Sequence, residues 1–132
     1  MTSSDFPADP YVAAFPELAC FWQATARGIL LLPYCQECRQ THWHPRAFCP
    51  HCGGEQLHWK PASGNATLHT FSIIYRAREP SYVLAYVQLD EGPLALSNIV
   101  GADAAGLRIG MRLRVAFRQT SEGRHAPVFE PS

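Results

Sequence analysis

Two Cys-x-x-Cys pairs constrain this chain more than any other feature. Cys35 and Cys38 form the first pair, Cys49 and Cys52 form the second, and ten residues separate them. Two residues between cysteines allow a tight turn to direct both sulfurs at one ion, and two such turns complete a tetrahedral shell. Ten residues leave room for two strands and a turn. The spacing therefore predicts a structural zinc ribbon.

The residue after each cysteine pair refines this prediction. Gly53 follows the second pair, where such a turn, called a knuckle here, favours a residue that tolerates a positive φ. Arg39 holds the matching place after the first pair, so we expect a less ideal knuckle there. His51 lies inside the second knuckle and is a candidate for a supporting contact to the metal ligands.

Other uses of the four cysteines compete with zinc. Iron of the rubredoxin type takes the same ligand set, and sequence alone does not separate the two metals. A disulfide framework needs an oxidising compartment, which no feature of the chain indicates. A thioredoxin-like redox pair needs one Cys-x-x-Cys beside a βαβ pattern, which is absent here. His42 and His44 are spare donors near the cysteines, but four thiolates already fill a tetrahedron, so we interpret them as surface or packing residues.

Composition narrows the class of protein. The chain has 132 residues, of which 47% are hydrophobic, as expected for a folded domain or two small ones. Eleven basic and eleven acidic residues cancel. Zero net charge disfavours nucleic acid as the main partner, because affinity for it depends on neutralising phosphates. The longest apolar run, 29–32, is too short to cross a bilayer, and no segment has the pattern of a signal peptide. We therefore expect a cytoplasmic protein with no membrane partner.

The first part of the chain, residues 1–28, is predicted to be a loose arm followed by a helix. Residues 1–14 are small, polar and interrupted by prolines. A helix is expected near 16–27, since Leu18, Phe21, Trp22 and Thr25 repeat at helical spacing. Phe21 and Trp22 are large for so small a domain to cover. We therefore predict that part of this helix packs on another chain, with these two residues as candidate partner contacts.

Strand patterns dominate the remainder. A strand over 29–34 leads into the zinc ribbon, which is assigned to 29–59, and residues 60–65 are expected to form a linker or turn. Strands are then predicted at 68–75, 82–89, 94–100 and 111–117, with a last one around Val128 and Phe129. Five short strands without a long helix indicate a small Greek-key barrel such as an OB-fold over 60–132.

The order of these motifs resembles the DUF35 family. The resemblance covers roughly residues 15–130. It depends on Arg27-Gly28, on the run 31–35 (LLPYC), on Pro45-Arg46 before Cys49, and on barrel segments at 87–92, 98–101, 107–111 and 127–129. It implies a mainly β fold, with an N-terminal helix, a rubredoxin-like zinc ribbon and a C-terminal five-stranded OB-fold.

The resemblance also implies an accessory role. Members of this family are typically assembled with thiolase-like enzymes, including acyltransferases and aldolases, or with acyl-CoA hydratases of the hot-dog fold. The expected function is a non-catalytic subunit of an acyl-CoA-processing complex in lipid metabolism. Acyl-CoA has phosphates that need cations and an acyl chain that needs an apolar channel. We therefore predict that Tyr75, Arg76 and Arg78 line the approach to a ligand site lying mostly on the partner.

Two other functions stay open at this point. A nucleic-acid-binding module would use Arg112, Arg114 and Arg118 with Tyr75, Tyr82 and Tyr86 as a stacking groove. Arginines that protect a strand edge explain the same pattern without a ligand. An enzyme in its own right, such as an iron electron carrier, is the other possibility. The sequence contains no evident nucleophile with a base, and Cys20, beside Phe21, is interpreted as a packed side chain.

Overall fold

The computed structural model describes residues 9–132, which fold into two compact units. Unit 1 contains the described residues up to Ala62 together with Phe117–Ala126, and unit 2 contains Ser63–Ala116 together with Pro127–Ser132. Unit 1 carries the helices and the four-cysteine segment, and unit 2 carries most of a β-barrel. No helix among the described residues is long and apolar enough to span a membrane.

The chain begins with a short helix that the sequence pattern did not predict. Helix α1 spans Pro10–Ala14, and the Asp9 side chain caps it by accepting from the backbone N–H groups of Tyr11 and Val12. Asp9 is buried and pairs with Arg124 of the Phe117–Ala126 segment. The expectation of a loose arm over 1–14 is therefore wrong for 9–14, and residues 1–8 lie outside the described part. The missed signal is an Asp cap followed by proline at the first helical position.

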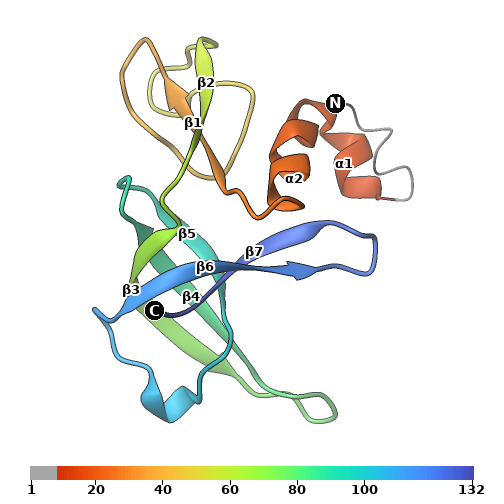
Figure 1. The fold of residues 1–132 in the computed structure, drawn as a ribbon, viewed down its shortest axis with the longest axis vertical. Helices are drawn as coiled ribbons and strands as arrows, with labels where there is room; N and C mark the ends of the chain where they lie inside the picture. Colours follow the sequence, from red (N-terminus) through yellow and green to blue (C-terminus); the bar gives the residue numbers. More distant parts are fainter. Residues whose placement is uncertain (1–8) are drawn as a thin grey trace. The chain divides into compact units, whose positions relative to one another are not determined.

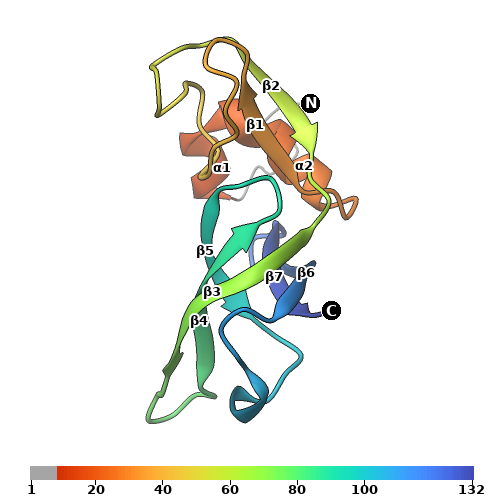
Figure 2. The ribbon, with the colours of Figure 1, turned by 90° about the vertical axis from the view of Figure 1, so that its left-hand side faces the viewer.

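The predicted helix at 16–27 exists in two parts. A 3-10 turn, η2 (Pro16–Leu18), leads directly into α2 (Ala19–Thr25), and Gly28 ends the segment with φ 77°. The four residues at helical spacing are all buried, which confirms the predicted apolar face. Figures 1 and 2 show α1 and α2 side by side within unit 1.

An aromatic cluster fills the interior of unit 1. Phe21 is 1% exposed and Trp22 is 5% exposed. The Phe21 ring meets Trp22 edge-on, with centroids 4.8 Å apart, and lies 5.7 Å from Trp43 and 6.3 Å from Trp59. This chain's own tryptophans thus cover Phe21, which corrects the expectation that so small a domain would leave these aromatic side chains uncovered. A contact between this helix and another chain stays a prediction, but such a contact could not involve Phe21, because this side chain is buried.

Two antiparallel strands frame the cysteine segment. Strand β1 (Leu31–Cys35) pairs with β2 (Leu57–Pro61), with Pro33 opposite Trp59. The expected strand at 29–34 is thus confirmed within two residues. The predicted linker at 60–65 is shorter than expected, because β2 continues to Pro61 and the next strand begins at Asn65.

Five strands close into a barrel in the order β3-β4-β5-β7-β6, which confirms the predicted OB-fold (Figure 2). They are β3 (Asn65–Ile74), β4 (Tyr82–Leu89), β5 (Leu94–Ile99), β6 (Arg112–Gln119) and β7 (His125–Pro131), with a 3-10 turn η3 (Ala104–Gly106) before β6. Alternation places Val83, Ala85, Val87 and Leu89 inside the barrel. The β5–β7 pairing is parallel at Ile99 and Phe129, and the other pairings with β3 and β4 are antiparallel.

Candidate metal centre

The four cysteine sulfurs gather at one point of unit 1. All of them lie within 4.8 Å of one another. Cys35 Sγ is 3.6 Å from Cys52 Sγ, and Cys38 Sγ is 3.6 Å from Cys49 Sγ. A tetrahedral zinc with Zn–S bonds of about 2.3 Å sets its sulfurs about 3.8 Å apart. The donor set and its spacing therefore fit one zinc ion, and sulfurs at 3.6 Å are too far apart for a disulfide bond of about 2.05 Å.

Each cysteine pair lies on a backbone turn that holds its sulfurs in place. The N–H of Arg39 donates to the carbonyl of Cys35 at 2.8 Å, and the N–H of Gly53 donates to that of Cys49 at 2.8 Å. Both closing residues have positive φ, 61° at Arg39 and 77° at Gly53. The two knuckles are thus equivalent in backbone shape, and the first one forces an arginine into a conformation that glycine adopts more readily.

The thiols differ in acidity without a metal. Burial opposes ionisation of Cys49, but the backbone N–H groups of Cys52 and His51 and the neighbouring thiols outweigh it and lower the pKa of Cys49 to about 7. Burial, together with hydrogen bonding to the other cysteines, raises the pKa of Cys38 to about 12. Cys49 therefore ionises more readily than Cys38 before metal arrives, and zinc binding displaces the proton of Cys38.

The surroundings make this centre a structural one. Cys35 and Cys49 are buried, Cys38 is half-buried and Cys52 is exposed. Four thiolates fill the zinc coordination sphere and leave no position for a water or substrate. The ion would therefore hold the two knuckles together and perform no chemistry itself.

The nearby histidines play different parts. The backbone N–H of His51 donates to Cys49 Sγ at 3.4 Å, so the predicted supporting contact exists but comes from the main chain. His42 is buried, and the structure gives its ring nitrogens no hydrogen-bond partner among the described residues. Burial, with repulsion from Arg46 and His51, lowers the pKa of His42. A neutral, packed His42 agrees with the interpretation of this residue as a packing histidine.

The three candidate ligand residues lie at the β3–β4 loop of unit 2. Tyr75 is 79% exposed. The Arg76 guanidinium pairs with Glu79, donates to the Pro80 carbonyl at 2.7 Å and lies over the Tyr82 ring. Arg76 therefore orders its own loop, whereas Arg78 is exposed and makes no ion pair or hydrogen bond within residues 9–132.

Two of the three arginines of the alternative nucleic-acid groove, Arg112 and Arg114, are held by acidic partners. Arg112 forms two hydrogen bonds with the Asp90 carboxylate at 2.8 and 2.9 Å, and Arg114 pairs with Glu130 at 3.1 Å. The hydrogen bond from Arg112 lowers the pKa of Asp90. Both guanidiniums are exposed, but their charges are already matched. This arrangement favours the interpretation that Arg112 and Arg114 protect strand edges from aggregation over the interpretation that they bind phosphates.

Comparison with known proteins connects this geometry to a family. The family model for the rubredoxin-like zinc ribbon domain of ChsH2 matches residues 22–58, and that for the ChsH2 C-terminal OB-fold domain matches residues 59–118. A DUF35 domain-containing scaffold protein of Methanothermobacter thermautotrophicus is 30% identical over 94 residues, which cover 67% of this chain and 71% of that protein. This chain belongs to the DUF35 family. Its four-cysteine site is accordingly the structural zinc centre of a rubredoxin-like ribbon.

Three further proteins resemble this chain. The solved structure named Ltp2-ChsH2(DUF35) aldolase contains a chain with 27% identity and a TM-score of 0.75, and the match covers 86% of this DUF35 protein and 93% of that chain. A probable enoyl-CoA hydratase alpha subunit of Thermomonospora curvata is 27% identical over 117 residues. This DUF35 protein spans only 37% of the length of that hydratase subunit. A DUF35 structure from Sulfolobus solfataricus, with 15% identity and a TM-score of 0.64, shares the fold.

Proposed function

We propose that this DUF35 protein is a non-catalytic accessory subunit of an acyl-CoA-processing complex. It assembles with a thiolase-like enzyme, an acyltransferase or aldolase, or with an acyl-CoA hydratase, and supports the reaction of that partner. The observation that carries the proposal is the likeness over 93% of a chain in the structure named Ltp2-ChsH2(DUF35) aldolase. Because the likeness includes both the ribbon and the barrel, it concerns the whole accessory chain and not one shared module.

The chemistry of the metal centre supports a role without catalysis. A zinc ion enclosed by four thiolates has no open position, so it stabilises the ribbon and does not activate a water. The fifth cysteine, Cys20, is half-buried, and burial raises the pKa of its thiol, which makes it a poor nucleophile. Reactivity toward a thioester is therefore expected to come from the partner, with the cytoplasm as the proposed place of action.

Acyl-CoA at a site shared with the partner is the finer part of the proposal. In the exposed β3–β4 loop, Tyr75 offers a ring and Arg78 offers a cation that has no ion-pair partner within residues 9–132. A phosphate or pyrophosphate group is the part of acyl-CoA that such a cation recognises. Arg76 holds the loop in place through Glu79 and Pro80.

Co-purification tests the proposal directly. The tagged, zinc-loaded chain is co-expressed with each thiolase-like and each hydratase-type protein encoded near it, and complexes are separated by size exclusion with mass determination. We expect a stable complex with one of these proteins, and acyl-CoA turnover only when that protein is present. Turnover by the DUF35 protein alone would identify it as an enzyme, and failure to associate with any of these proteins would remove the accessory role.

A further inference from the structure

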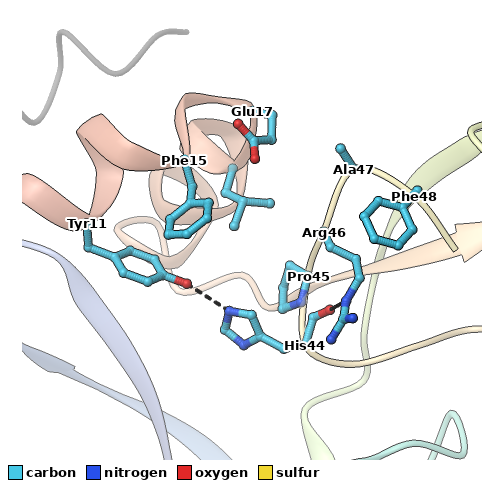
Figure 3. A pocket seen from close by; sticks show the side chains of 9 residues that line it. Tyr11, Phe15, Glu17, His44, Pro45, Arg46, Ala47 and Phe48 are labelled. Atoms are coloured by element: carbon cyan, nitrogen blue, oxygen red, sulfur yellow. Dashed lines mark hydrogen bonds between the residues drawn. The ribbon is translucent and has the colours of Figure 1, made fainter. Parts of the chain in front are cut away.

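A cleft in unit 1 is lined by none of the four metal-binding cysteines. It has a volume of about 330 Å³ and lies between the α1–η2 segment and the loop 44–48 (Figure 3). Volumes of roughly 300–1,000 Å³ are typical of small-molecule sites. Its lining is mostly apolar and consists of Tyr11, Phe15, Glu17, Leu18, His44, Pro45, Arg46, Ala47 and Phe48.

Two phenylalanine rings stand on opposite sides of this cleft. Phe15 comes from the end of α1 and is 44% exposed, and Phe48 comes from the loop before Cys49 and is 50% exposed. Figure 3 shows Phe15 above Tyr11 and Phe48 across the gap. Exposed aromatic rings facing a hollow offer contact area to an apolar body of ring size. The sequence pattern did not reveal this pair, because Phe15 follows directly on the segment that was assigned to a loose arm.

One exposed polar pair lines the cleft. The Tyr11 hydroxyl and Nε2 of His44 are 2.9 Å apart. The Tyr11 ring is fixed from three directions: it lies 5.2 Å from the Phe15 ring, it meets Trp22 edge-on at 5.9 Å, and the Arg124 guanidinium lies 4.8 Å from its centroid. A phenol held in this way is a positioned hydrogen-bonding group and not a freely moving surface side chain.

The charge in the cleft is balanced. His44 is exposed, but partial desolvation of its ring, together with repulsion from Arg46, lowers its pKa and favours the neutral imidazole. Glu17 and Arg46 carry opposite charges at the rim, and Arg46 Nε donates to the His44 carbonyl at 3.2 Å. The lining therefore offers a charged ligand no net attraction.

The Tyr11–His44 pair indicates which polar group a ligand would carry. When the phenol donates to Nε2, its oxygen accepts from a ligand. When Nε2 carries the proton and donates, the phenol O–H is free to donate to a ligand. A ligand hydroxyl both donates and accepts, so it fits either arrangement.

We propose that this cleft binds a small uncharged molecule with a ring-sized apolar body and one hydroxyl group. The apolar body lies between Phe15 and Phe48, and the hydroxyl bonds to the phenol of Tyr11. This inference is independent of the accessory role, because it depends only on side chains of unit 1.

Titration of the zinc-loaded full chain with three probes tests the inference. The probes are 4-methylphenol, which has both features, toluene, which lacks the hydroxyl, and benzoate, which is charged. Amide chemical shifts in NMR spectra locate the binding and give each dissociation constant. We expect shifts confined to the cleft segments, with 4-methylphenol binding more tightly than toluene and benzoate binding weakest.

Three variants separate the two halves of the site. Tyr11→Phe keeps the ring and its stacking but removes the hydroxyl, so it should weaken 4-methylphenol about fivefold and leave toluene unchanged. Phe48→Ala should weaken both neutral probes. Leu96→Ala removes an equally exposed apolar side chain from unit 2 and should change neither.

Several outcomes would overturn the inference. Shifts outside the cleft would place the binding elsewhere, and equal loss of both probes in Tyr11→Phe would show that the hydroxyl contact does not exist. Tighter binding of benzoate would identify an anion site at Arg46. Complete loss of 4-methylphenol binding once the partner enzyme is added would show that the cleft is a protein docking surface.

Discussion

At the scale of single residues, the backbone of the two knuckles explains more than the ligands alone. Arg39 and Gly53 follow their cysteine pairs at the same place and share a positive φ. A β-carbon added at Gly53 would meet no heavy atom within 4 Å, so a side chain there faces open space and only the backbone conformation is strained. The sequence could predict this place because glycine occurs where φ is positive, but it could not show that Arg39 adopts the same conformation.

Replacing Gly53 by alanine isolates that backbone cost. A left-handed conformation destabilises the folded state of a non-glycine residue by about 1–2 kcal/mol. Alanine also reduces the conformational entropy of the unfolded chain, which stabilises the folded state by about 0.4–1 kcal/mol. We expect Gly53→Ala to lower the free energy of unfolding of the zinc-loaded protein by about 1 kcal/mol, measured by urea denaturation. Gly106→Ala is the matched control, since it also meets open space but lacks a positive φ. An equal loss in both variants would contradict this explanation.

The cysteines themselves carry the largest single-residue effect. Structural zinc contributes about 10–16 kcal/mol of apparent binding free energy in zinc-finger peptides, and a ribbon this small depends on it. We expect Cys49→Ser to lose the zinc and to unfold at least residues 29–59, whereas Cys20→Ser should keep one zinc per chain. Elemental analysis and circular dichroism of proteins purified without chelator measure both. A Cys49→Ser protein with a full zinc content and an ordered ribbon would refute the prediction.

At the scale of elements, local patterns predicted what local forces determine. The strand β4 was expected at 82–89 and lies at Tyr82–Leu89, because every second residue from Val83 to Leu89 is apolar and faces the interior of the barrel. Helix α1 was missed although its capping aspartate and first-turn proline are visible in the sequence, and its contact with a residue far along the chain could not be predicted. Asp9 caps α1 through Oδ1 and contacts Arg124, which is 115 positions further along the chain, through Oδ2. No periodicity in the first 14 residues encodes that partner.

Substitutions at Asp9 separate its two tasks. Asp9→Asn keeps an oxygen that can cap the helix but loses the charge that faces Arg124, and Asp9→Ala loses both. Breaking a buried ion pair costs about 3–5 kcal/mol, and losing a cap costs about 1 kcal/mol more. Because Arg124 keeps 19% exposure, we expect the lower end of the first range. Thermal unfolding should rank the native protein above Asp9→Asn and that variant above Asp9→Ala.

Asp103 provides the control for this series. It occupies the cap position of η3 but makes no side-chain capping bond. Asp103→Ala should therefore change stability by no more than about 0.5 kcal/mol. If Asp9→Ala behaved in the same way, the contact with Arg124 would not stabilise α1.

At the scale of the whole molecule, the fold was more predictable than the coverage of its side chains. The cysteine spacing and the strand count led to the ribbon and the barrel, and the order of motifs led to the family. Burial of Phe21 was not predictable in the same way, because it depends on Trp43 and Trp59, which lie at no fixed spacing from it. The cleft between α1 and the loop 44–48 was not predicted from the sequence for the same reason, because its Tyr11–His44 pair joins residues 33 positions apart.

The arginines of the β3–β4 loop are expected to affect how the assembled complex binds acyl-CoA. We propose that Arg78, which has no ion-pair partner in the described part of the chain, offers its cation to a phosphate of acyl-CoA. Arg76 pairs with Glu79 and donates to the Pro80 carbonyl, so it acts by ordering the loop. We expect Arg78→Ala to raise the KM of the complex for acyl-CoA severalfold at low salt, with kcat and complex formation unchanged, and the effect should shrink as salt screens the charge. Replacing both arginines by alanine should raise KM further, because the loop loses its order as well.

Arg108→Ala removes an exposed charge from the same unit and serves as the control. Steady-state kinetics from low to physiological ionic strength measures these effects. If the KM of the double variant equals that of the native complex at low salt, the loop arginines contact only solvent, and the ligand part of the proposal is withdrawn while the accessory role stands.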